Sequence, residues 1–100
     1  MNKLTAILLL AISMQAQASD NCKRIAAYAE TVMKARQANA PLLDALSTLE
    51  GITHEQSRRS LEQIIRGAYE QPVMQTEKEK AQAVIGYGTS THLLCVLVQK

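Results

Sequence analysis

The chain has 100 residues, with 11 Lys and Arg against nine Asp and Glu, and a formal net charge of +2. This nearly balanced charge argues against a nucleic-acid-binding protein, because such proteins carry a dense basic face that displaces counterions. The sequence contains three Tyr but neither Trp nor Phe, so its core must come from aliphatic side chains, Met and Tyr. One small domain is expected.

The first 18 residues have the three parts of a secretory signal peptide. A positive start at Lys3 leads into an apolar stretch over 4–12 and then to Ala16-Gln17-Ala18, which fits an A-x-A cleavage site. The sequence therefore predicts cleavage between Ala18 and Ser19 and export to a periplasm or beyond. The apolar stretch is shorter than the roughly 20 residues that cross a bilayer, and no later segment is expected to span one. We expect no stable membrane anchor after cleavage.

Cleavage leaves residues 19–100 as a single domain and removes Lys3, so ten basic residues face nine acidic ones. The only two cysteines, Cys22 and Cys95, are predicted to form one disulfide in an oxidising compartment. In the chain-entropy model, a bridge across so long a loop stabilises the fold by roughly 4 kcal/mol.

Residues 20–39 are predicted to form an amphipathic helix, since the residues facing the core recur at steps of three and four. They are Cys22, Ile25, Ala26, Ala29, Val32, Met33 and Arg36. Asn39-Ala40-Pro41 is expected to end this helix, because proline cannot continue a helix but suits the first turn of the next.

A short second helix is expected after Pro41, ending at Gly51. Its buried side is predicted to hold Leu42, Leu43, Leu46 and Leu49. A third helix is expected to begin at Thr53, whose hydroxyl and the Gln56 side chain would form a capping box, and to end before Pro72.

Thr76 and Glu79 repeat the capping-box signature and predict the start of a fourth helix. Its core-facing stripe is expected to contain Ala81, Ile85, Gly88, His92 and Cys95, with Val84 beside it. Residues 86–91 are poor helix formers that could kink or end the helix and leave 93–98 as a short strand. The helix is favoured, because a lone strand would have nothing to pair with. The sequence therefore predicts an all-α bundle of about four helices, with one disulfide joining the first and last helices in an antiparallel pair.

The sequence predicts no catalytic residue, cofactor or metal site, and hence no enzyme. The alternative is thiol or zinc chemistry at His92 and Cys95, with Cys22 as a further ligand, but no fourth ligand is visible. Tyr69 and Tyr87 are the candidate partner surface, because tyrosine combines apolar area with a polar tip. The alternative for both is packing at the edge of the core.

Four segments carry a resemblance to a known group of proteins. They are Cys22, then Ala29-x-x-Val32-Met33-x-Ala35-Arg36-Gln37, then Ala68-Tyr69-Glu70-x-Pro72, and a final helix carrying Cys95. In these the chain resembles small exported helical proteins of bacterial genomes and prophages. The resemblance covers nearly all of residues 19–100 and implies fold and export, without an assigned activity.

Two classes of function are compatible with these features. The first is an interaction protein of the periplasm or envelope that modulates an envelope or phage-related component. The second is a small disulfide-bonded stress chaperone that holds unfolded clients. Both predict a protein partner and neither predicts a nucleic acid.

Overall fold

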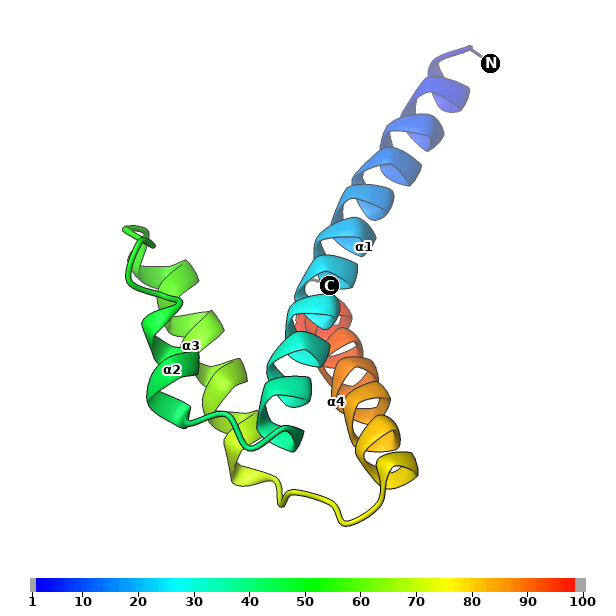
Figure 1. Cartoon of the computed structure of the whole chain (residues 1–100). Coiled ribbons are helices and arrows are strands. Elements are labelled where there is room, and N and C mark those ends of the chain that lie inside the picture. The colour runs from blue at the N-terminus through cyan, green and yellow to red at the C-terminus, as the bar shows by residue number, and fades with distance from the viewer. Residues whose placement is uncertain (1, 99–100) are drawn as a thin grey trace.

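The structure is a computed structural model that describes the backbone of residues 2–98, with side chains from Asp20 onward. Within that range four helices follow one another up and down: α1 (Asn2–Gln37), α2 (Leu42–Ser47), α3 (Glu55–Glu70) and α4 (Glu77–Val98). They lie in the order α2, α3, α1, α4 across the molecule (Figure 1). Because residues 2–98 contain helices and no strand, the predicted all-α bundle is confirmed and the alternative strand at 93–98 is wrong.

The antiparallel pair of α1 and α4 forms the largest contact between helices (Figure 1). Cys22 and Cys95 form the predicted disulfide, with their Cα atoms 5.5 Å apart and 73 positions apart in the sequence. About two turns along from the disulfide, a Cβ at Gly88 would lie 2.5 Å from Cγ of the Glu30 side chain. A side chain at position 88 would therefore require the Glu30 side chain to move.

α1 ends at Gln37 through a left-handed Asn39, whose φ is 62°. The N–H of Ala40 donates to the carbonyl of Ala35 over 3.0 Å, and the N–H of Asn39 donates to that of Arg36 over 3.0 Å. This pair of bonds satisfies the last carbonyls of the helix and turns the chain sharply. The predicted break at Asn39-Ala40-Pro41 is confirmed.

α2 is shorter than the sequence predicts and buries fewer of its leucines. Leu49 is buried and Leu42 and Leu46 are half-buried, but Leu43 is 76% exposed. A helix of six residues offers only one narrow side to α3, and Leu43 lies on the other side. Gly51 does not end α2, because the helix stops at Ser47 and no described glycine has a positive φ.

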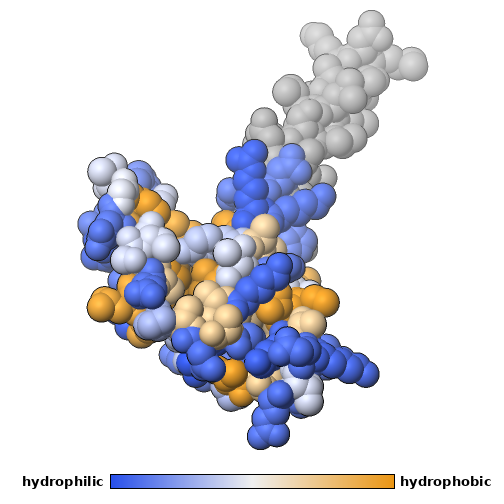
Figure 2. Space-filling model, in the orientation of Figure 1, coloured by the Kyte–Doolittle hydropathy of each residue, from blue (hydrophilic) through white to orange (hydrophobic). Residues whose placement is uncertain are grey.

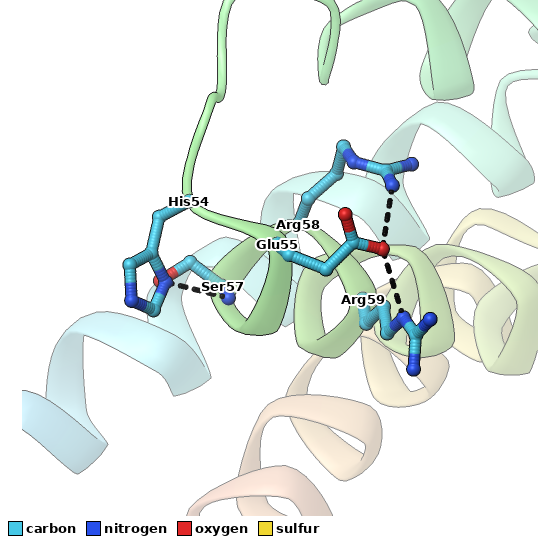
Figure 3. A network of polar contacts seen from close by, with 5 residues as sticks. All are labelled: His54, Glu55, Ser57, Arg58 and Arg59. Atoms are coloured by element: carbon cyan, nitrogen blue, oxygen red, sulfur yellow. Dashed lines mark hydrogen bonds and ion pairs between the residues drawn. The ribbon is translucent and has the colours of Figure 1, made fainter.

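α3 begins one residue later than the sequence predicts. His54 is the N-cap, and its Nδ1 accepts a hydrogen bond of 3.2 Å from the N–H of Ser57 (Figure 3). Thr53 is therefore not the cap. In the first turn the Glu55 carboxylate accepts bonds from Arg58 at 3.0 Å and Arg59 at 3.1 Å (Figure 3).

α4 begins with the predicted capping box and continues without a break to Val98. The N–H of Glu79 donates to Oγ1 of Thr76 over 3.1 Å, and Oε1 of Glu79 accepts from Thr76 in return. The buried stripe is centred on Val84 and Gly88, whereas Ile85 is 61% exposed. The prediction that Ile85 belongs to the buried stripe is wrong, because the face of α4 that packs against α1 is centred on Val84.

The core lies where α1, α3 and α4 meet. Its buried members are Val32, Met33, Leu49, Ile65, Ala68 and Val84. Half-buried residues from every helix surround it, including Tyr28, Tyr69 and Tyr87. Hydrophobic residues also remain visible on the surface between hydrophilic ones (Figure 2).

In length and composition α4 is the one candidate for a membrane span in the part of the chain that the structure describes. Its 22 residues have a window of mean hydropathy 1.3. The expectation that no segment after the leader is long and apolar enough to span a bilayer is therefore wrong on these two criteria. In the fold, α4 packs along α1 through Val84 and Gly88.

Candidate functional site

A groove between α1 and α4 has a volume of about 560 Å³. We call it the α1·α4 groove. Its apolar lining comes mainly from Ala81, Val84 and Ile85 of α4, and Gln37 and Ala38 line it at the end of α1. The antiparallel packing creates it, because small residues such as Ala81 leave space beside the helix contact. The groove is thus a shaped apolar surface held between two helices that a disulfide joins.

Two acids and two bases also line the α1·α4 groove. Glu30 and Lys34 come from α1, and Glu77 and Lys80 come from the first turn of α4. Nζ of Lys80 lies 3.6 Å from Oε1 of Glu77, so these two charges are paired across one helical turn. Opposite charges beside apolar side chains suit a peptide segment that carries both kinds of charge.

A second hollow of about 300 Å³ lies on the same seam, toward the disulfide, and shares Glu30 with the first. Lys23 and His92 both line it. Nε2 of His92 is buried and has no hydrogen-bond partner among the described atoms. His92 therefore has an unpaired polar atom near the contact between α1 and α4.

The structure does not assemble a thiol or zinc site around His92 and Cys95. Cys95 is bonded to Cys22 and has no free thiol in this state. Among the residues whose side chains the structure describes, no three His, Cys, Asp or Glu side chains gather as metal ligands. His54-Glu55, which resembles the start of a zinc-protease motif, instead caps α3 and pairs with arginines.

Tyr69 and Tyr87 both hold the helices together through their hydroxyl groups. The Tyr69 hydroxyl donates to the carbonyl of Ala40 over 2.8 Å, and the Arg36 guanidinium lies 5.4 Å from the centre of its ring. The Tyr87 hydroxyl donates to the carbonyl of Ile64 over 2.6 Å. Both rings are half-buried, so each has an intramolecular role, and the role in partner binding stays a prediction.

The pKa of Tyr87 is raised above its ordinary value. Burial of the ring is the main cause, and the negative charge of Glu70 raises the pKa further, while a backbone hydrogen bond at Ala68 opposes both. At neutral pH the hydroxyl therefore stays protonated and available as a donor to Ile64.

Two features of the structure were not predicted from the sequence. One is the α1·α4 groove, which depends on the distance and angle between helices. The other is Gln37, a buried side chain whose amide donates to the carbonyl of Pro72 over 3.0 Å and accepts from the N–H of Met74 over 2.8 Å. A polar residue on the apolar side of an amphipathic helix was the available signal for Gln37.

No family model matches this chain, and no curated protein or solved structure is significantly similar to it. The resemblance to small exported helical proteins therefore remains a prediction. The disulfide itself indicates an oxidising, extracytoplasmic environment.

Proposed function

We propose that the protein is an exported interaction protein of the bacterial periplasm or envelope, which binds a segment of a partner protein in the α1·α4 groove. The observation that carries this proposal is a groove lined by the apolar Ala81, Val84 and Ile85 together with charged side chains of both signs. The resemblance to exported helical proteins of genomes and prophages supports an envelope or phage-related component as the partner. The predicted signal peptide gives the route of export.

The disulfide supports binding by fixing the groove before the partner arrives. Cys22 and Cys95 fasten one end of the α1–α4 pair, while Gln37 ties the other end of α1 to the connection that enters α4. A preorganised groove loses less conformational entropy on binding than a flexible one. The partner segment would therefore bind without a large rearrangement of the two helices.

Site-specific photo-crosslinking in the producing cell tests this proposal. A photoreactive amino acid at Lys34 or Ala81, two groove positions that are exposed, should give the same partner band. The same label at Gln63, which is exposed on α3 outside the groove, is the matched control. A band that is equally strong from Gln63, or no band from either groove position, would contradict groove binding.

Export is tested separately by intact mass. The protein recovered from the periplasm or medium should begin at Ser19 and contain no free thiol. A protein that stays in the membrane fraction with Met1 attached would contradict cleavage, without bearing on the groove.

A stress chaperone is the second candidate, favoured by apolar side chains at the end of α4. Leu94 is 63% exposed and Val98 is 82% exposed, and exposed apolar area of this kind can hold unfolded clients. This candidate predicts suppressed aggregation of unrelated proteins, most strongly after partial unfolding at low pH. An interaction protein with one partner should leave such aggregation unchanged.

A further inference from the structure

Gly86 occupies the middle of α4 without an intramolecular reason. A Cβ at Gly86 would meet nothing within 4 Å, whereas one at Gly88 would collide with Glu30 and one at Gly67 with the Tyr87 hydroxyl. Glycine is among the least favourable residues inside a helix. Nothing within the described chain accounts for glycine at this position, but close approach by another molecule would.

Gly86 also opens onto a hollow of about 300 Å³ on the far side of α4 from the α1·α4 groove. Its walls include Met33, Met74 and Tyr87, with Gly86 and Ser90 along one edge. We call it the Gly86 hollow. It is a mainly apolar receptacle, and Tyr87 in its wall was one of the two residues that the sequence suggested for partner contact.

Two exposed leucines lie on the same side of the helix as the hollow. Gly86, Ser90, Leu93 and Leu97 follow one another at steps of four, three and four, which places them on one stripe of an α-helix. We call these four residues the outer stripe. Leu93 and Leu97 are both more than half exposed, and the stripe faces away from the buried Val84 and Gly88. The outer stripe therefore carries both a cavity and side chains of a size to fill it.

We propose that two copies of this chain pair through the outer stripes of α4, antiparallel, with Leu93 of each copy seated in the Gly86 hollow of the other. A two-fold axis midway between positions 89 and 90 brings position 93 of one copy opposite position 86 of its mate. The same axis places position 97 opposite 82. Such a self-complementary contact closes into a dimer, because the same surface serves both copies.

The charge and polarity of α4 favour a second copy as the occupant over a lipid bilayer. Residues 81–98 contain no Asp, Glu, Lys or Arg, so a two-fold axis brings no like charges together. Gln82, Thr89 and Ser90 are exposed on this side and would lose water without compensation in hydrocarbon. In the antiparallel dimer, Thr89 of one copy meets Ser90 of the other, and their hydroxyls can bond to each other.

Sedimentation equilibrium of the disulfide-bonded protein over a series of concentrations tests the dimer. The wild type should show a reversible monomer–dimer equilibrium, and Leu93→Lys should raise the dissociation constant by at least about tenfold, because it places a charge at the centre of the contact. Leu43→Lys makes the same change at an exposed leucine of α2 and should leave the constant unchanged. Circular dichroism and a count of free thiols verify that each variant is folded.

Gly86→Gln tests the seating of Leu93. Because the space beside Gly86 is open in the single chain, this variant should fold at least as well as the wild type and yet dimerise at least about tenfold more weakly. Ala81→Gln, on the groove side of the same helix, is its control.

Three results would overturn the proposal: a wild type that is monomeric at every concentration, a Gly86→Gln variant that dimerises as well as the wild type, or a Leu43→Lys variant that weakens the dimer as much as Leu93→Lys. So would monomers that sediment with vesicles of phosphatidylglycerol and phosphatidylcholine, since the stripe would then face lipid.

Discussion

Gln37 bonds the connection between α3 and α4 from a buried position, so its loss should be costly. Its amide bonds the backbone of both Pro72 and Met74, and the side chain is only 3% exposed. Gln37→Met keeps a similar volume but leaves the Met74 N–H without its acceptor, which costs roughly 1–3 kcal/mol. We expect urea unfolding to show this loss. Gln63→Met, at an exposed position, should change the stability by less than about 0.5 kcal/mol.

Tyr87 should make stability fall at alkaline pH. Its pKa is raised in the fold, so the folded state favours the protonated hydroxyl. That contribution is complete below the ordinary tyrosine pKa of about 10 and is lost as the pH rises through the folded-state pKa. Tyr87→Phe should therefore have a flatter dependence of unfolding free energy on pH above about 10. Identical slopes for the wild type and Tyr87→Phe would contradict this linkage.

At the scale of the element, two substitutions distinguish the two candidate N-caps of α3, His54 and Thr53. His54→Ala removes the bond from Nδ1 to the N–H of Ser57 and should cost about 0.5–1.5 kcal/mol. Thr53→Ala removes the hydroxyl that the sequence suggested and should cost almost nothing. Urea midpoints of the two variants provide the comparison. A larger loss from Thr53→Ala would place the cap where the sequence predicts it.

Boundaries set by local chemistry were predictable from the sequence, and boundaries set by packing were not. The Thr76–Glu79 box and the turn at Asn39 depend only on neighbouring residues, so their sequence signatures were sufficient. The exposure of Ile85 and Leu43 depends on how α4 and α2 are rotated against their neighbours. The periodicity of apolar residues indicates which side of a helix is buried, but it locates the centre of that side only to within one residue. In α4 the centre is Val84 rather than Ile85.

At the scale of the molecule, the candidate site follows from the distance between helices rather than from a motif. The close crossing at Gly88 and the small Ala81 together leave the α1·α4 groove beside a tight contact. The sequence predicts which helices touch, because two cysteines specify the pair. The sequence cannot predict a groove of about 560 Å³, because its volume depends on the distance between the helices and on how their side chains pack.

The disulfide should contribute about 4 kcal/mol to the stability of the whole molecule, because it closes a loop of 73 residues in the unfolded chain. Urea unfolding with and without dithiothreitol measures this difference. The reduced protein should unfold at a markedly lower urea concentration. The variant Cys22→Ala with Cys95→Ala should resemble it and be insensitive to the reductant.

Reduction should also loosen the two ends of the α1–α4 pair unequally. Beyond His92, α4 exposes most of its apolar side chains and has the disulfide as its one covalent tie to α1. The other end is fixed through Gln37 and the connection to α3. Hydrogen exchange should therefore accelerate over 91–98 in the reduced protein while 77–84 stays protected. Uniform acceleration along α4 would mean that the disulfide stabilises the bundle as a whole rather than one end of the groove.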